Sequence, residues 1–363
     1  MAQQIHNFSS GPCILPKEVM QKAAEAVINY NNSGLSIIEM SHRSKDFEAV
    51  MDKSFALVRE LLNVPENYDI SFLQGGASLQ FTMVPQNLFP VGGKVGYINT
   101  GVWGTKALKE AEFYGETICV ASSKDKNFSY IPKDYVIPKG LAYLHYTSNN
   151  TIYGTQFKTI PQTDAPLICD MSSDIMSKVI DVSKFDLIYA GAQKNIGPAG
   201  VVLVISKKGI FGKTGRAIPT MMDYRTHIDN GSMFNTPPCF SIFTCMLTME
   251  WMKSIGGIAE IEKMNEAKAK LLYDEIDANP LFVGTAAKED RSLMNVCFVM
   301  KDSALEPEFS KLAKERGLSG INGHRSVGGF RASIYNAMPI SSVQALVNAM
   351  QDFAKTKGAY GGE

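Results

Sequence analysis

The segment DLIYAGAQKNIGPAGVVLVI, residues 186–205, decides the fold expected for this chain. Two short, almost wholly apolar runs, 186–190 and 201–205, flank a turn of small residues that contains Lys194. Runs of this length and composition are typical of strands buried on both faces. A lysine between them is expected to lose hydration, which lowers the pKa of its amine and makes it a nucleophile suited to a carbonyl group. The alternative is an ordinary loop lysine at a strand end.

The same pattern continues on the N-terminal side of this segment. Further strands are predicted at 70–73, 94–99, 141–146 and 167–170. Helical spacing of apolar residues predicts helices at 46–62, with Asp46 as the N-cap, and at 105–114. Short apolar strands that alternate with helices indicate an α/β fold, a mostly parallel sheet covered by helices.

A different pattern begins after Gly256-Gly257. It comprises a long charged helix from 258 to about 276, a strand at 295–300, and two further helices at 307–316 and 341–355 around a Gly-rich strand region. We therefore expect a large domain at 17–256 and a smaller α+β domain at 257–363. Residues 1–16 are expected to be extended and to associate with the smaller domain, because they contain several Pro and Gly residues.

Overall charge and composition exclude several classes of protein. The 363 residues contain 36 Lys plus Arg and 36 Asp plus Glu, so the formal net charge is zero. A nucleic-acid-binding protein normally has a basic surplus. Basic residues are instead concentrated locally: residues 187–222 contain five basic and no acidic residues, and three arginines are the only charged residues in 316–350. These regions are candidates for binding a small anion.

The chain shows no signal for a membrane or a metal. No apolar stretch approaches the roughly 18 to 20 residues that a membrane span requires, and the first residues do not resemble a secretion signal, so a cytoplasmic protein is expected. The six cysteines lack the spacing of a zinc or redox motif. The histidines also lack metal-ligand spacing, and no metal is expected.

Two further features complement Lys194. Asp170 ends the apolar run 166–170, at the edge of the predicted sheet where α/β folds bind ligands, although it could simply cap the next turn. The strand at 70–73 leads into the small-residue turn 75–78, whose backbone N–H groups could hold a phosphate, or which could be only a tight turn. A lysine, a carboxylate and a phosphate cradle together suit pyridoxal 5′-phosphate (PLP).

Two side chains could complete a site for the PLP ring. Trp103 lies between small residues after the strand at 94–99 and could stack on a flat ring, although tryptophan is more often a core residue. Thr151 follows a predicted strand and could contact the cofactor or only satisfy a turn.

Two His-Arg pairs are the candidates for binding a substrate anion. His42-Arg43 lies early in the chain, and His324-Arg325 lies late, followed by Arg331. A run of like charge is usually a solvated face. The late arginines, however, lie among glycines and apolar residues, and guanidinium groups bind phosphate or carboxylate through two hydrogen bonds.

Taken together, these blocks resemble the phosphoserine aminotransferases, a family of class V PLP-dependent aminotransferases. The resemblance covers residues 8 to about 338 in the family's order. Its blocks are 8–12, 41–43, 75–81, 191–200, 230–238, 323–325 and 331–337.

The resemblance implies the fold of aspartate aminotransferase and a homodimer whose active sites are shared between subunits. It implies reversible transfer of the amino group of L-glutamate to 3-phosphohydroxypyruvate, which gives O-phospho-L-serine and 2-oxoglutarate in serine biosynthesis. It also allows a second activity on 3-hydroxy-4-phosphooxy-2-oxobutanoate in pyridoxine biosynthesis.

The resemblance also implies roles for individual residues. Lys194 binds PLP covalently and then moves protons, and Asp170 pairs with the ring nitrogen. The remaining cofactor contacts are Ala77, Ser78, Trp103, Thr151, Gln193 and, toward the partner subunit's PLP, Asn235 and Thr236. The substrate contacts are Arg331 for the α-carboxylate and His42, Arg43, His324 and Arg325 for the distal phosphate. Some members have arginine where this chain has Ser78, so here the phosphate would depend more on the His-Arg pairs.

Two alternatives to this function remain. One is another PLP enzyme of the same fold, such as a desulfurase, a lyase or an alanine–glyoxylate-type transaminase; no cysteine here lies in a motif that marks a desulfurase. The other is a phosphate-binding protein without catalysis, which would be colourless when purified.

Overall fold

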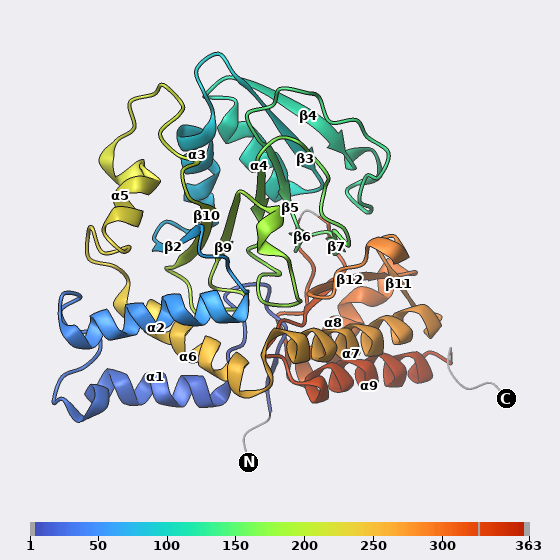
Figure 1. Cartoon of the computed structure of the whole chain (residues 1–363). Coiled ribbons are helices and arrows are strands. Elements are labelled where there is room, and N and C mark those ends of the chain that lie inside the picture. The colour runs from blue at the N-terminus through green and yellow to red at the C-terminus, as the bar shows by residue number, and fades with distance from the viewer. Residues whose placement is uncertain (1–3, 326, 359–363) are drawn as a thin grey trace.

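The computed structural model describes residues 4–325 and 327–358 and is built around a seven-stranded sheet. Figure 1 shows the arrangement of its elements. The strands are β2 (Tyr68–Leu73), β3 (Lys94–Asn99), β4 (Glu116–Ser122), β5 (Leu144–Thr147), β8 (Leu167–Asp170), β9 (Leu187–Gly191) and β10 (Val202–Lys207). Their order is β2-β10-β9-β8-β5-β3-β4. Strand β10 runs antiparallel to both β2 and β9, and the other neighbouring pairs are parallel. The predicted α/β class with a mostly parallel sheet is confirmed.

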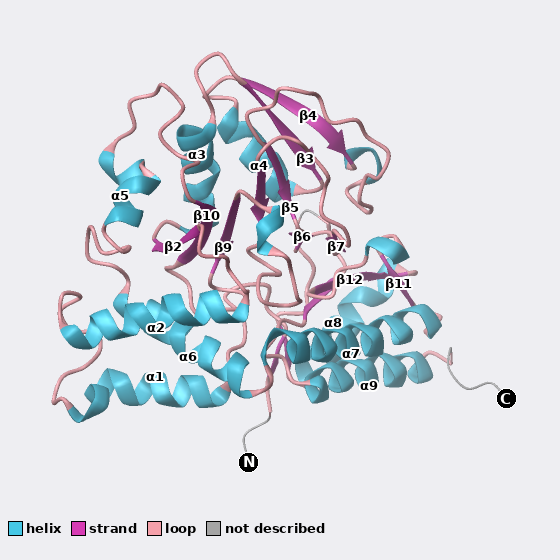
Figure 2. Ribbon diagram, in the orientation of Figure 1, coloured by secondary structure: helices cyan, strands magenta, loops and turns pink. Residues whose placement is uncertain are grey.

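Helices cover both faces of this sheet (Figure 2). One layer consists of α1 (Lys17–Asn29), α2 (Lys45–Leu61) and α6 (Cys239–Ser254), and the other of α3 (Gly76–Leu88), α4 (Val102–Ala111) and α5 (Tyr224–Asp229). Successive residues of a strand alternate between the two cores. Ile188 and Ala190 belong to the first core, and Leu187 and Tyr189 to the second. This explains the continuous apolar runs in the sequence.

The C-terminal part has its own sheet and core. Its elements are α7 (Gly257–Ala278), β11 (Phe282–Gly284), β12 (Asn295–Met300), α8 (Glu306–Glu315), β13 (Leu318–Ser319), β14 (Phe330–Ser333) and α9 (Ile340–Thr356). The antiparallel sheet β11-β12-β14 packs with these helices around a third core. The N-terminal strand β1 (His6–Asn7) pairs in parallel with β13, and Phe8 is buried in the same core. The division into domains at residue 256 stays a prediction, and its outermost residues, 1–3 and 359–363, lie outside the described ones.

The structure corrects some boundaries predicted from the sequence. Ser44, not Asp46, caps α2, because its extended backbone places its hydroxyl to accept a hydrogen bond from the Phe47 N–H at 3.3 Å. Asp46 lies inside the first turn, where its charge complements the helix dipole. The small hairpin of β6 (Asn149–Asn150) and β7 (Thr155–Gln156) was not predicted.

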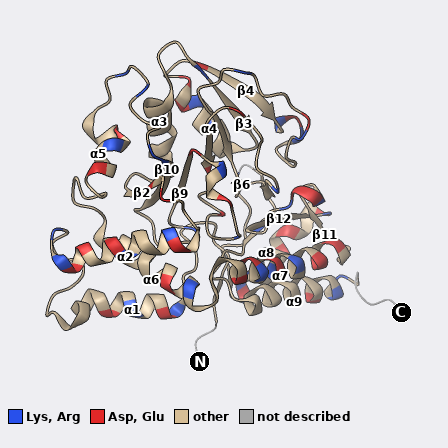
Figure 3. Ribbon diagram, viewed as in Figure 1, with Lys and Arg blue, Asp and Glu red and all other residues tan. Residues whose placement is uncertain are grey.

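Charges of both signs are interspersed on the helices, for example on α2 and α7 (Figure 3). None of the described helices is long and apolar enough to cross a bilayer. Within residues 4–325 and 327–358, no three His, Cys, Asp or Glu side chains are grouped so that they could hold a metal ion.

Candidate active site

A cavity of about 260 Å³ lies where the parallel strands of the large sheet end. Asp170 is the last residue of β8, Lys194 follows β9, and the Gly75-Gly76 turn follows β2. Ligands of α/β proteins bind at this edge because the loops there diverge. Most of the residues predicted for the site line the cavity, namely Ala77, Ser78, Trp103, Thr151, Asp170, Gln193, Lys194, His324 and Arg331.

Lys194 is held inside this cavity by the N-terminal segment of the chain. Its Nζ donates to the Ser10 carbonyl at 2.9 Å and lies 3.5 Å from the hydroxyl oxygen of Tyr335. Burial lowers the pKa of Lys194 to about 8; the charge of Asp170 acts in the opposite direction, and that of Arg331 adds to the lowering. A larger fraction of the amine is therefore neutral at physiological pH than for a lysine in water, as a nucleophile requires.

Asp170 is almost completely buried and lines the same cavity as Lys194. One of its carboxylate oxygens accepts a hydrogen bond from the Ser172 N–H at 2.9 Å. Burial raises the pKa of Asp170 to about 6, against the opposing effects of the Ser172 hydrogen bonds and the charge of Lys194. No described Lys, Arg or His side chain forms an ion pair with Asp170, so this buried carboxylate is suited to a ligand that brings a positive charge.

The turn between β2 and α3 leaves its backbone open to the cavity. Gly75 and Gly76 both have positive φ, 86° and 65°, which glycine adopts without strain. A Cβ at Gly76 would meet no atom within 4 Å. The first N–H groups of α3 have no partners within the helix, so this open turn can hold a phosphate.

Trp103 and Thr151 form one wall of the cavity. The indole Nε1 donates to the Thr151 hydroxyl at 3.1 Å, which fixes the edge of the ring. The guanidinium of Arg331 donates to the Thr151 carbonyl at 3.0 Å, and its Nε is buried without a partner. A guanidinium with an unused buried donor can bind a carboxylate in the cavity.

The other predicted site residues lie outside this cavity. The side chains of Arg43, Arg325 and Thr236 are exposed, and that of His42 is buried with its Nε2 unpartnered. Asn235 lines a separate small hollow near β2, and the Thr236 carbonyl accepts a hydrogen bond from Gln74 Nε2 at 3.1 Å. His324, by contrast, lines the cavity. Burial lowers the pKa of His324, and the nearby charges of Arg331, Arg325 and Lys106 lower it further. Ser326, next to the late His-Arg pair, lies outside the described residues.

The sequence did not predict several residues that line the cavity or contact Lys194. Ser10 and Gly11 line it directly, and Ser172 also lies in its wall. The segment that contains Ser10 is held because the Ser333 N–H donates to the Phe8 carbonyl at 3.2 Å and the Cys13 N–H to the Gln193 carbonyl at 3.2 Å. The Ser-Ser-Gly-Pro composition of residues 9–12 was the only signal for this close approach.

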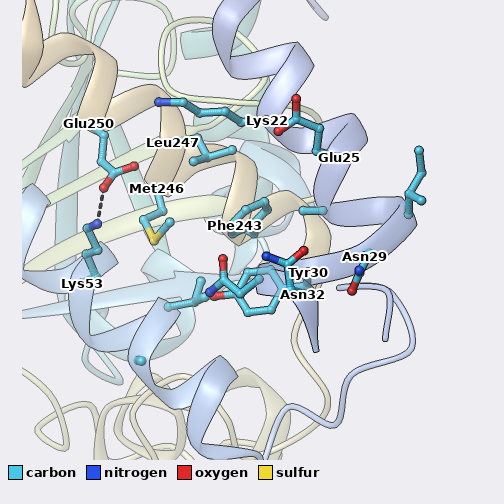
Figure 4. Close-up of a pocket in the computed structure, with 15 residues that line it drawn as sticks. Lys22, Glu25, Asn29, Tyr30, Asn32, Lys53, Phe243, Met246, Leu247 and Glu250 are labelled. Carbon is cyan, nitrogen blue, oxygen red and sulfur yellow. Dashed lines mark ion pairs between the residues drawn. The ribbon is translucent and has the colours of Figure 1, made fainter. Parts of the chain in front are cut away.

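A more open hollow lies between α1, α2 and α6 (Figure 4). Its walls combine the apolar Phe243, Met246 and Leu247 with an ion pair between Lys53 and Glu250. None of the residues predicted for the site lines it. The candidate active site is therefore the smaller cavity around Lys194.

The cavity meets the requirements of PLP on the structure alone. It combines a buried lysine with a lowered pKa, a buried carboxylate that forms no ion pair with a described residue, and an open glycine turn at the start of a helix. These match the aldehyde, the ring nitrogen and the phosphate of PLP respectively.

Comparisons with known proteins agree with this chemistry. The model of the family described as Aminotransferase class-V matches residues 5–346. A phosphoserine aminotransferase of Flavobacterium psychrophilum is 57% identical over 348 residues, which are 96% of this chain and 98% of that protein.

Solved structures give the same result. A structure described as radiation damage of the Schiff base in phosphoserine aminotransferase is 49% identical, with a TM-score of 0.95 over 98% of this chain and 100% of that one. A PLP-bound phosphoserine aminotransferase of Trichomonas vaginalis is 39% identical, with a TM-score of 0.91 over 96% and 99%.

Proposed function

Because the chain belongs to the class V aminotransferases, and within them to the phosphoserine aminotransferases, we propose that it transfers the amino group of L-glutamate to 3-phosphohydroxypyruvate. The products are O-phospho-L-serine and 2-oxoglutarate, and the reaction is reversible. The observation that supports this most directly is the single cavity in which Lys194, Asp170 and Arg331 meet.

The cofactor is PLP, which supplies, when bound, a ring that accepts the electron pair left when a bond at the substrate's Cα breaks. We propose that Lys194 binds it covalently and that Asp170 pairs with its ring nitrogen. The turn at Gly76, Ala77 and Ser78 would hold its phosphate. The remaining contacts would come from Trp103, Thr151 and Gln193.

Lys194 has a second role in this mechanism. When it is not bonded to the cofactor, its amine would be free to accept the proton from the substrate's Cα. A pKa of about 8 suits this role, because an amine that titrates near physiological pH can both take up and release a proton.

We propose that the substrate is held at its two anionic ends. The guanidinium of Arg331, whose Nε has no partner among the described residues, would bind the α-carboxylate, which both substrates share. The distal phosphate would be bound by His324 and Arg325, together with the pair His42 and Arg43. Since Ser78 has no charge, these pairs would supply the positive charge for the phosphate.

We also propose a homodimer with shared active sites. Asn235 and Thr236 do not line the cavity of their own chain. Thr236 is exposed, and the neighbouring Phe234 is 43% exposed, which leaves this loop accessible to a second copy of the chain. The two residues would then complete the phosphate site of the partner subunit.

The experiment that tests the function is a comparison of two acceptors with L-glutamate as the donor. Unphosphorylated hydroxypyruvate should have a kcat/KM at least about a hundredfold below that of 3-phosphohydroxypyruvate. Two charged hydrogen bonds would be lost, at about 1.5 to 3 kcal/mol each. Equal values would contradict the proposed acceptor while leaving the aminotransferase class intact.

A further inference from the structure

The amine of Lys194 has an unusual set of polar neighbours. Of the described residues, only the Ser10 carbonyl and the Tyr335 hydroxyl lie within hydrogen-bond distance of Nζ, at 2.9 and 3.5 Å. No described carboxylate forms an ion pair with it. Both neighbours offer it a neutral oxygen. The amine is therefore placed by two neutral acceptors and not by a countercharge.

Burial and hydrogen bonds fix the position of the Tyr335 side chain. Its side chain is fully buried, and burial raises the pKa of its phenol far above the usual value, so the hydroxyl keeps its proton. That hydroxyl donates to the Ser10 carbonyl at 2.8 Å. Its oxygen accepts from the Asn295 side-chain amide at 3.1 Å. With the proton directed to Ser10, the lone pairs of the oxygen face Asn295 and Lys194.

The partners of Tyr335 come from separate parts of the chain. Asn295 begins β12, and its side-chain oxygen accepts from Asn149 Nδ2 at 2.8 Å, so the large sheet's loops support it. Ser10 lies in the N-terminal segment. A residue whose only task was to fill the core would not need all these polar partners, because phenylalanine would fill the same space.

We propose that Tyr335 is a positioning residue of the reaction: its phenol oxygen and the Ser10 carbonyl hold the free amine of Lys194 where that amine exchanges a proton with the substrate. This inference rests on the proposed function. Because both acceptors favour an N–H donor, they stabilise the protonated amine. Tyr335 therefore also opposes the effect of burial on the pKa of Lys194.

Other groups act on the amine as well. The charge of Asp170 raises the pKa of Lys194, and that of Arg331 lowers it. The Cys13 thiol donates to the backbone carbonyl of Lys194, and burial raises the pKa of this thiol to about 12, so it stays neutral. These residues are unchanged in the variants below, so a shift in the pKa of Lys194 reports on the Tyr335 oxygen.

The test uses the full chain after removal of PLP. Acetic anhydride acetylates neutral amines, and mass spectrometry of the peptide that contains Lys194 gives its rate of acetylation at each pH. Tyr335→Phe should lower the midpoint of this titration by about half a unit, a shift of the size expected from losing one weak hydrogen bond. Acetylation near pH 7 should be about threefold faster. In the PLP-bound enzyme, the acid limb of the kcat–pH profile should move in the same direction.

Tyr68→Phe is the matched control. Tyr68 is also buried, and its hydroxyl donates to the Phe185 carbonyl at 2.6 Å, at the opposite end of β9 from Lys194. Its variant should lose similar stability and leave the Lys194 midpoint where it is. A midpoint in Tyr335→Phe that equals that of the control overturns the proposal. Failure of PLP to attach to Lys194 in the wild type would instead contradict the proposed function.

A second variant keeps the test decisive if Tyr335→Phe does not fold. Asn295→Ser removes the amide that competes with Lys194 for the Tyr335 oxygen. The oxygen then becomes a better acceptor for the amine, and the Lys194 midpoint should rise. An unchanged or lower midpoint overturns the proposal.

Discussion

The buried carboxylate of Asp170 lowers the free energy of unfolding of the cofactor-free protein, although the same carboxylate is suited to binding a ligand. Its pKa is raised from 3.8 to about 6 in the folded chain without cofactor. Between these pH values the folded state keeps a proton that the unfolded state has released. The free energy of unfolding therefore falls as the pH rises through this window, and the loss is complete above pH 6.

The first prediction follows from this sign. In the PLP-free protein at pH 8, Asp170→Asn should raise the free energy of unfolding by about 1 to 3 kcal/mol and abolish most turnover. The gain should shrink toward pH 4. Urea unfolding at several pH values measures the gain in stability and its dependence on pH. The exposed Asp164→Asn is the control and should change stability by less than about 0.5 kcal/mol. A gain that does not depend on pH would contradict the account.

At the residue scale, the sequence was sufficient to predict the site residues that lie at or just after the ends of apolar strands. Lys194 and Asp170 could be found because Asp170 ends an apolar strand and Lys194 follows one, and such strands end at one edge of a sheet. Ser10 and Tyr335 could not be found in this way. Their contact with Lys194 depends on how the N-terminal segment and the residues after β14 fold back over the sheet, and no spacing in the sequence encodes it.

At the scale of elements, the turn from β2 into α3 combines two glycines with different tasks. A Cβ on Gly75 would lie 2.4 Å from Leu79 Cδ2 and 2.7 Å from Leu79 Cβ. Gly75 is therefore required for packing of the first turn of α3. Gly76 has open space around it and lies in the wall of the cavity. It is required for the approach of a ligand.

The second prediction separates these tasks. Gly75→Ala should lower the free energy of unfolding of the PLP-free protein by about 2 to 4 kcal/mol, since positive φ and the clash with Leu79 add. Gly76→Ala should cost only about 1 kcal/mol but weaken PLP binding about tenfold, because its methyl group occupies space next to the phosphate. Denaturant unfolding and PLP titration give the two quantities. Equal stability losses would show that the Leu79 contact relaxes.

Most elements were predictable, and the exceptions have physical reasons. The apolar runs marked β2, β3, β8, β9 and β10 because both of their faces are buried. The edge strand β4 was missed because its side chains are only partly buried, so it has neither a continuous apolar run nor a strict alternation. The antiparallel direction of β10 was not predicted, although the connection from β9 is too short for the crossover that a parallel neighbour needs.

At the scale of the whole molecule, the N-terminal segment links the two ends of the chain. It pairs with β13, passes Lys194 and then enters α1 in the first helical layer. From the C-terminal part, Arg331 on β14 lines the same cavity, and Tyr335 in the turn after β14 contacts Lys194. The catalytic edge of the large sheet is thus completed by residues from both termini, and the proposed dimer would add a further pair from a second chain.

The last prediction tests this sharing of active sites. A chain with Lys194→Ala cannot catalyse in its own site but can still supply Asn235 and Thr236 to a partner. A chain with Asn235→Ala and Thr236→Ala has the opposite defect. If the sites are shared, each hybrid dimer has one site with both defects and one complete site. Random mixing makes about half of the dimers hybrid, so the mixture should recover about a quarter of wild-type kcat.

The control for this experiment is a mixture of the Lys194→Ala chain with a chain that carries all three substitutions. It forms the same kinds of dimer but contains no intact Lys194 and should stay inactive. Both mixtures are made by refolding differently tagged chains together, and the hybrid is isolated through both tags. Activity of the first mixture that does not exceed that of its separate parents would show that Asn235 and Thr236 act within their own chain or not at all. Recovery would require a second copy of the chain, because within one chain these two residues lie outside the cavity that contains Lys194.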